Sequence, residues 1–296
     1  MKNPVFTGAG VAIVTPFIGD ELKINYPLLE QIIEDQIKNG TDAIIICGTT
    51  GESSTLDHEE HVQAIRFAAK TVAGRIPVIA GTGSNDTEYA VRLSNDAEAC
   101  GVDALLSVTP YYNKTSQDGL IEHYTYICER VSTPVILYNV PSRTGVDIKP
   151  ETYKALSEIK LINGAKEANS SISALAKSIA LCGDELNFYS GNDDQITAFM
   201  SLGAKGVISV LSNVAPAVAH NIAAAALKGD FALSAKLQLE YLDLCNDLFV
   251  DVNPIPVKAA MELMGIPVGR CRRPLAPLNQ ANTQKLTQAL RNHGLI

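Results

Sequence analysis

Short apolar segments rich in valine and isoleucine recur at similar intervals along this chain, and they constrain its fold more than any other feature. They cover residues 11–14, 43–47, 78–80, 104–108, 135–138, 161–165, 186–189 and 206–210. The stretches between them have apolar residues at helical spacing, as in Leu28, Leu29, Ile32, Ile33 and Ile37. An alternation of strands and helices predicts parallel βαβ units.

The turns that lead into these segments support the same architecture. Gly40, Gly101 and Gly203 are placed to end one helix before the next strand, and Pro77 and Pro134 stand at strand entry. Eight such units predict an α/β fold of the (β/α)8 TIM barrel type. The alternative is an open doubly wound sheet, but no Gly-x-Gly-x-x-Gly sequence follows the first segment.

The strand pattern stops after about residue 228, which predicts two parts to the chain. Residues 1–228 would form the catalytic barrel, and residues 229–296 a helical C-terminal extension. Helical periodicity in that extension covers residues 231–249, 256–264 and 283–293.

Charge and composition exclude several classes of function. A formal net charge of −8 argues against nucleic-acid binding, which depends on clustered lysine and arginine. No apolar run is long enough to span a membrane, and the first residues lack the apolar core of a signal peptide, so we expect a cytoplasmic protein. The scattered cysteines and the His58–His61 spacing match no zinc motif, so we predict neither a metal nor a cofactor.

Unusual polar residues follow five of the predicted strands. Active sites of (β/α)8 barrels lie at the carboxyl ends of the strands, so these residues should converge on one pocket. They include Thr49 and Thr50 after the second segment, Tyr111 and Tyr112 after the fourth, Tyr138 and Arg143 after the fifth, Lys166 after the sixth and Gly191 after the seventh.

Lys166 would supply a nucleophilic amine at this pocket. It follows the apolar sequence Leu-Ile-Asn-Gly-Ala, and burial of a lysine favours its uncharged form. A lone lysine is more often a surface residue whose stem lies along the protein. A nearby phenol from Tyr138 for proton transfer, and a guanidinium from Arg143 for a carboxylate, together favour a Schiff-base aldolase. The Gly48-Thr-Thr-Gly51 loop would bind a carboxylate or simply cap the next helix.

Four motifs carry a resemblance to a known family: Gly48-Thr-Thr-Gly-Glu52, Tyr111-Tyr-Asn113, Tyr138-Asn-Val-Pro-Ser-Arg-Thr-Gly145 and Gly164-Ala-Lys-Glu167. In order and spacing they resemble the dihydrodipicolinate synthases, pyruvate-dependent class I aldolases, over essentially the full chain. The resemblance implies a barrel with a helical C-terminal domain, commonly a homotetramer. It also implies condensation of pyruvate with L-aspartate 4-semialdehyde to 4-hydroxy-tetrahydrodipicolinate, in the diaminopimelate route to lysine.

The resemblance also assigns catalytic roles. Lys166 would form the imine with pyruvate, and Tyr138 would be the general acid and base. Thr49 and Tyr112 would relay protons to solvent, with Tyr112 reaching across from a neighbouring subunit.

Further residues would bind the substrates in such an enzyme. Thr50, together with Thr49, would hold the pyruvate carboxylate, and Arg143 would bind the carboxylate of the semialdehyde. Gly191 and Ile208 match positions near the lysine that contribute through the backbone.

A feedback site for lysine exists in regulated members of such a family. Its matching positions here are Ser53, His58, His61, Asn85 and Tyr111. Tyr89 stands where an acidic residue usually meets the amino group of the inhibitor, so the resemblance leaves lysine inhibition open.

Two other functions compete with this one. N-acetylneuraminate lyases and 2-keto-3-deoxy sugar-acid aldolases share the lysine and the Tyr-Asn-x-Pro segment. Arg143 favours a short acceptor that ends in a carboxylate over a long polyhydroxylated one. A catalytically inactive keto-acid-binding relative is the non-enzymatic alternative, against which the intact set of Thr49, Tyr112, Tyr138 and Lys166 argues.

Overall fold

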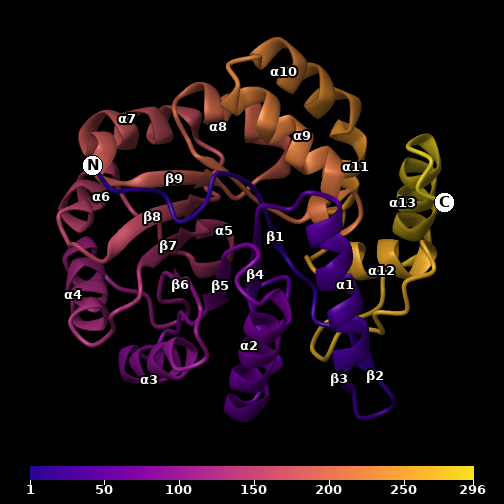
Figure 1. The fold of residues 1–296 in the computed structure, drawn as a ribbon, viewed down its shortest axis with the longest axis horizontal. Coiled ribbons are helices and arrows are strands. Elements are labelled where there is room, and N and C mark those ends of the chain that lie inside the picture. The colour runs from indigo at the N-terminus through magenta and orange to yellow at the C-terminus, as the bar shows by residue number, and fades with distance from the viewer.

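The computed structural model describes residues 1–296 and contains a closed barrel of eight parallel strands surrounded by helices (Figure 1). Around the barrel the strands follow the order β1-β10-β9-β8-β7-β6-β5-β4, which confirms the predicted (β/α)8 class. They are β1 (Gly8–Ala12), β4 (Ala43–Ile46), β5 (Val78–Gly81), β6 (Ala104–Val108), β7 (Val135–Asn139), β8 (Ile162–Glu167), β9 (Asn187–Ser190) and β10 (Gly206–Ser209).

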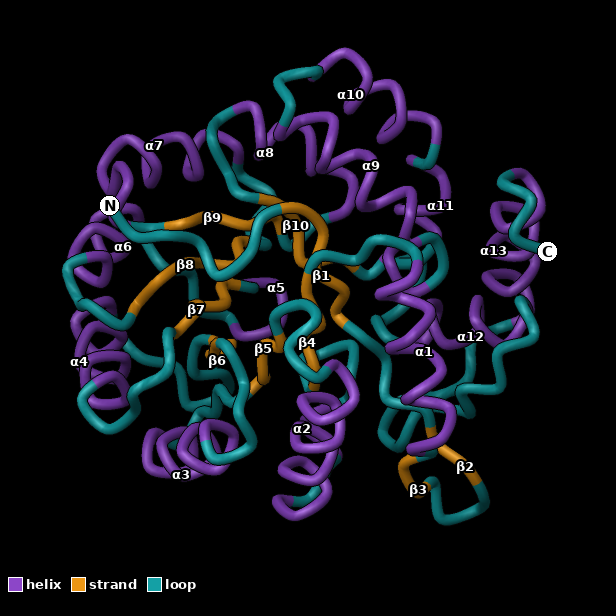
Figure 2. Tube along the Cα trace, in the orientation of Figure 1, coloured by secondary structure: helices purple, strands orange, loops and turns teal.

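Helices form a layer outside the strands, as the purple and orange segments of Figure 2 show. They are α1 (Tyr26–Lys38), α2 (His58–Val72), α3 (Thr87–Glu98), α4 (Gln117–Cys128), α6 (Pro150–Ser157), α7 (Ile172–Cys182), α8 (Ile196–Ser201) and α9 (Pro216–Leu227). Several begin at a side-chain cap. Asp57, for example, accepts a hydrogen bond from the backbone N–H of Glu60, which satisfies one free donor of the first turn of α2.

Glycine permits the barrel to close between β1 and β10. Gly8 pairs with Gly206 in the parallel register, and Gly206 has a φ of 159°. A Cβ atom at Gly206 would lie 1.9 Å from the backbone oxygen of Gly8. No other residue fits so close an approach of two backbones. The glycines also explain why β1 begins at Gly8, three residues before the segment predicted from its valines.

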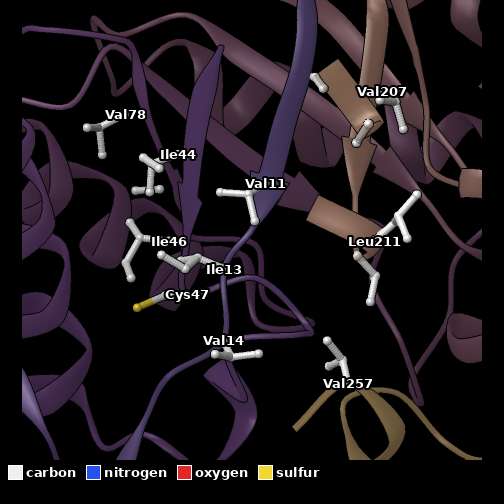
Figure 3. Close-up of a cluster of buried hydrophobic side chains, with 14 of the residues drawn as sticks. Val11, Ile13, Val14, Ile44, Ile46, Cys47, Val78, Val207, Leu211 and Val257 are labelled. Atoms are coloured by element: carbon white, nitrogen blue, oxygen red, sulfur yellow. The ribbon is translucent and has the colours of Figure 1, made fainter. Parts of the chain in front are cut away.

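Apolar side chains fill both faces of the strands. A small cluster inside the barrel includes Ile45, Ile136 and Ile208, and the stacked rings of Phe6 and Tyr189, whose centroids are 4.5 Å apart. A larger cluster lies between the strands and the helices. Figure 3 shows part of it, in which Val257 of α12 (Ile255–Leu263) joins residues of the first two sequential barrel strands, such as Val11 and Ile44.

The C-terminal part consists of helices, as predicted. They are α10 (Phe231–Glu240), α11 (Leu242–Asp247), α12 and α13 (Gln280–Asn292). The predicted helix over residues 231–249 is interrupted at Tyr241, between α10 and α11. The predicted boundary after residue 228 falls in the turn between α9 and α10, and the division of the chain into two domains there remains a prediction.

Two small features complete the fold. The strands β2 (Phe17–Ile18) and β3 (Lys23–Ile24) form an antiparallel hairpin that the sequence pattern did not predict. The short helix α5 (Pro141–Thr144) follows β7 directly. Among all the helices, none combines the length and the apolar character required to cross a membrane.

A buried ion pair joins the C-terminal part to the barrel. The Lys258 Nζ of α12 lies 2.8 Å from Glu52 Oε1, and the two side chains are only 2% and 1% exposed. Glu52 Oε2 accepts a hydrogen bond of 2.8 Å from the backbone N–H of Arg272. The Lys258 ammonium also lies 4.2 Å from the ring centre of Phe17. Because Glu52 belongs to the loop after β4, this pair holds α12 against that loop.

Replacement of Lys258 should destabilise the protein strongly. A Lys258→Met change leaves the Glu52 carboxylate buried without its cation, and loss of one partner of a buried pair costs roughly 3–5 kcal/mol. Denaturant unfolding would measure the loss. Lys154→Met is the matched control, because Lys154 pairs with Glu158 on the surface and both side chains are exposed. Equal small losses in the two variants would show that the buried pair does not anchor α12.

Candidate active site

Lys166 and Tyr138 meet at the carboxyl ends of two adjacent strands. They are paired residues in the parallel register of β8 and β7, so both side chains point to the same face of the sheet. Lys166 Nζ lies 4.3 Å from the centre of the Tyr138 ring. The two residues are 6% and 7% exposed. A buried amine therefore lies next to a phenol, as nucleophilic amine catalysis requires.

The loop after β4 presents the predicted carboxylate-binding threonines. Thr50 is buried, and its Oγ1 accepts a hydrogen bond of 3.0 Å from Asn253 Nδ2. Thr49 lines a cavity of about 460 Å³ at the carboxyl end of the barrel. Asn253 thus holds the Thr50 hydroxyl at the strand ends, and the ion pair of Glu52 with Lys258 attaches the loop to α12.

Arg143 lies on α5, directly after the strand that carries Tyr138. It lines the same cavity as Thr49, and its Nη2 donates a 3.0 Å hydrogen bond to the backbone carbonyl of Asn253. The residue is exposed. A guanidinium at the solvent edge of this cavity can bind an incoming carboxylate through two parallel N–H groups.

Gly191 directly follows β9, the strand next to β8, whereas Ile208 lies one strand farther along the barrel, in β10. The backbone N–H of Gly191 donates to the carbonyl of Glu167 at 2.8 Å, and a Cβ atom at Gly191 would lie 2.8 Å from the Cβ of Ala168. Ile208 is fully buried in β10 and belongs to the same interior cluster as Tyr138. Close backbone packing thus explains the glycine, and the barrel core explains the isoleucine.

The two tyrosines after β6 face different surroundings. Tyr111 lines the cavity with Arg143, whereas Tyr112 is 91% exposed and does not line it. Tyr112 also has a φ of 68°, a left-handed backbone that is uncommon for an aromatic residue. Within one chain, therefore, Tyr112 is not brought to Lys166.

Only some of the residues matched to a lysine-binding site line the same cavity. Ser53, His61 and Tyr111 line the cavity of about 460 Å³. His58 Nε2 instead lies 3.1 Å from a carboxylate oxygen of Asp96. Asn85 lines a separate pocket of about 370 Å³.

Tyr89 and His61 contribute uncharged side chains to this cavity. Tyr89 lines the same cavity and packs edge-on against His58. Burial lowers the pKa of His61, whose Nε2 lies 2.8 Å from the carbonyl oxygen of Gly81, so its ring is neutral at pH 7. The cavity residues therefore bring no cation or carboxylate other than Arg143 to this place.

Glu167 is a buried carboxyl group that the sequence reasoning did not assign. It faces away from the barrel interior and accepts hydrogen bonds from Asn139 Nδ2 at 3.0 Å, from the Tyr153 hydroxyl at 2.7 Å and from the Asn169 backbone at 2.9 Å. Because Asn139 and Glu167 are register partners, they tie together the strand ends that carry Tyr138 and Lys166. The sequence could have indicated this contact. Neighbours in a strand face opposite sides, so if Tyr138 and Lys166 face one side, Asn139 and Glu167 face the other side together.

Glu167 should make stability depend on pH. Burial raises its pKa from 4.5 to about 7, so the folded protein binds this proton more tightly than the unfolded chain. The free energy of unfolding should therefore fall as pH rises from 5 to 8, by roughly 2 kcal/mol more than in Glu167→Gln, which has no proton to lose. Denaturant unfolding at both pH values measures the difference. Parallel pH dependence in the two proteins would contradict the assignment.

Comparisons with known proteins show which family this chain resembles. The model of the Dihydrodipicolinate synthetase family matches residues 5–293. A protein from Acetivibrio thermocellus named 4-hydroxy-tetrahydrodipicolinate synthase is 52% identical over the full length of both chains. A protein of the same name from Lachnoclostridium phytofermentans is 54% identical over 99% of each chain.

Solved structures show the same fold. The chloride-inhibited dihydrodipicolinate synthase from Acinetobacter baumannii, complexed with pyruvate, has a TM-score of 0.96 and 42% identity, with 98% of this chain and 99% of that chain covered. The dihydrodipicolinate synthase from Thermotoga maritima has a TM-score of 0.96 and 39% identity, covering 99% and 100%. The chain belongs to the dihydrodipicolinate synthetase family.

Proposed function

We propose that this protein is a lyase of lysine biosynthesis, a 4-hydroxy-tetrahydrodipicolinate synthase that condenses pyruvate with L-aspartate 4-semialdehyde through a Schiff base on Lys166. The observation that carries the proposal is the buried Lys166 amine, 4.3 Å from the Tyr138 ring at the carboxyl end of the barrel. The names of relatives about half identical over the whole chain support the choice of substrates.

The proposed reaction begins at the amine of Lys166. Its lone pair attacks the ketone carbon of pyruvate, and loss of water leaves a protonated imine. Removal of a methyl proton gives an enamine, which attacks the aldehyde carbon of the semialdehyde. The amino group of the bound product then displaces Lys166 from the imine carbon and closes the ring. Tyr138 lies beside the amine and transfers the protons of these steps.

Two binding groups would hold the two carboxylates apart. Thr49 and Thr50 lie on the loop after β4 and would donate hydrogen bonds to the carboxylate of pyruvate. Arg143 lies at the edge of the cavity and would bind the carboxylate of the semialdehyde. Gly191 and Ile208 would contribute through their backbone atoms.

The proposal includes an assembly of subunits. The strained backbone of Tyr112 and its exposed ring suit a side chain that enters a neighbouring subunit, where it would relay protons with Thr49. We therefore propose a homotetramer, arranged as a dimer of dimers, as is common in such a family. A cytoplasmic location fits the proposed substrates, which are central metabolites.

The alternative functions have less support. The two curated relatives that share about half of this sequence bear the synthase name, whereas neither is named as an N-acetylneuraminate lyase or a sugar-acid aldolase. Arg143 also favours an acceptor that ends in a carboxylate. An inactive keto-acid-binding protein would not require both the buried amine of Lys166 and the adjacent phenol of Tyr138.

Borohydride treatment with pyruvate should attach one pyruvate-derived group to Lys166. Reduction converts a transient imine to a stable secondary amine, so peptide mass spectrometry can locate it. Lys160→Ala, which removes an exposed lysine shortly before β8, should still be labelled, whereas Lys166→Ala should not. Absence of the adduct from the unaltered protein would refute the Schiff-base mechanism.

Arg143→Ala should affect the two substrates differently. Loss of a charge-assisted contact should raise the KM for aspartate semialdehyde roughly 10- to 100-fold, because such contacts contribute about 1.5–3 kcal/mol. Formation of the pyruvate imine should change much less. Steady-state kinetics and borohydride trapping measure the two effects, with Arg130→Ala, an exposed arginine at the end of α4, as the control. Equal losses in both steps would remove Arg143 from this role.

A further inference from the structure

Asn253, which lies outside the barrel, contacts both predicted substrate-binding groups. It precedes α12 and is 6% exposed. Its side-chain Nδ2 donates to Thr50 Oγ1 at 3.0 Å, and its backbone carbonyl accepts from Arg143 Nη2 at 3.0 Å. The two contacted residues come from different barrel loops, after β4 and after β7. A single residue of the C-terminal part thus connects them.

The contact to Thr50 determines what its hydroxyl can do. A threonine hydroxyl has one hydrogen to donate, and a carboxylate can only accept. Because the amide N–H of Asn253 donates to Thr50 Oγ1, the hydroxyl hydrogen remains free for another acceptor. The Asn253 amide therefore orients Thr50 as a donor toward an anionic ligand.

The amide oxygen of Asn253 supports a role other than stabilisation of the fold. Asn253 Oδ1 is buried and has no hydrogen-bond partner. A buried acceptor without a partner is costly, so an amide is a poor choice here for stability alone. If the amide were turned over, Oδ1 would accept the Thr50 hydroxyl hydrogen and remove it from any ligand. With Nδ2 toward Thr50, the hydroxyl hydrogen stays available to a ligand.

A second contact close to Asn253 in the sequence helps to fix its position. Lys258, on the first turns of α12, forms the buried ion pair with Glu52, two residues after Thr50. The C-terminal part therefore touches the loop after β4 at Thr50 and at Glu52. Two contacts to one loop keep Asn253 at a fixed position relative to Thr50, as a positioning role requires.

We propose that Asn253 is a positioning residue for both substrates: its amide orients the Thr50 hydroxyl toward the carboxylate of pyruvate, and its backbone carbonyl holds the Arg143 guanidinium where the carboxylate of the acceptor binds. The inference rests on the proposed function. It makes the C-terminal helical part a component of the active site.

The two contacts predict different effects of side-chain changes. Asn253→Ala removes the amide and keeps the backbone carbonyl, so the KM for pyruvate should rise roughly 3- to 10-fold, as expected for one lost hydrogen bond. The value of kcat and the KM for aspartate semialdehyde should change little. Asn253→Asp has nearly the same shape but accepts the Thr50 hydroxyl and repels an anion, so it should raise the KM for pyruvate further.

A double-mutant cycle shows whether Asn253 acts through Thr50. In a Thr50→Val protein the hydroxyl is absent, so the addition of Asn253→Ala should raise the KM for pyruvate no further. Asn246→Ala, an exposed asparagine on α11, is the control. Circular dichroism checks folding, and if Asn253→Ala fails to fold, the Asn253→Asp protein carries the test.

The outcomes separate this inference from the proposed function. If borohydride labels Lys166 of the unaltered protein with pyruvate, but the KM for pyruvate is unchanged in Asn253→Ala and Asn253→Asp, the positioning role is overturned. The role is also overturned if Asn253→Ala raises the KM for pyruvate by the same factor in the Thr50→Val protein as in the unaltered protein. If the unaltered protein is not labelled, the proposed function fails and this inference fails with it.

Discussion

Closure of the parallel barrel is the constraint on which the rest of the structure depends. Once β1 and β10 pair through Gly8 and Gly206, all eight strands end at one rim. The register between β7 and β8 then decides which side chains meet there. Tyr138 and Lys166 face the interior as a pair, and Asn139 and Glu167 face the opposite side as a second pair. A slip of β8 by one residue would turn Glu167 to the interior beside Tyr138 and would turn Lys166 to the opposite side.

The C-terminal helices add a second constraint at the same rim. Lys258 pairs with Glu52, and Asn253 contacts Thr50 and Arg143. The three contacted residues lie on segments that directly follow barrel strands. Loops at a barrel rim are the most mobile part of such a fold. Attachment of these loops to α12 explains how residues far apart in the sequence can keep a geometry suited to catalysis. The polar contacts of the C-terminal part are therefore as relevant to the site as the strands themselves.

Local pattern was sufficient to predict the strands and their ends. Seven of the eight predicted strands agree with the structure to within two residues, and Lys166 and Tyr138 lie together as their places at two strand ends suggested. The start of β1 was missed because Gly8 and Gly10 have no side chain to show a pattern. The hairpin of β2 and β3 was missed because two-residue strands have no periodicity.

Long-range contacts were beyond the reach of the pattern. Asn253 and Thr50 are 203 residues apart, and no local sequence pattern around either residue predicts their contact. The same holds for Glu52 and Lys258. Tyr112 differs again, because its exposed position in one chain gives it no partner, and its proposed role depends on a second subunit.

The central claim is that the buried amine of Lys166 and the guanidinium of Arg143, both at the carboxyl end of the barrel, select pyruvate and a short aldehyde that ends in a carboxylate. A comparison of pyruvate consumption with aspartate semialdehyde, N-acetylmannosamine and glyceraldehyde as acceptors tests this claim most directly. Efficient turnover with aspartate semialdehyde and little or none with the other two is the predicted result. Comparable or faster turnover with either polyhydroxylated acceptor would contradict it.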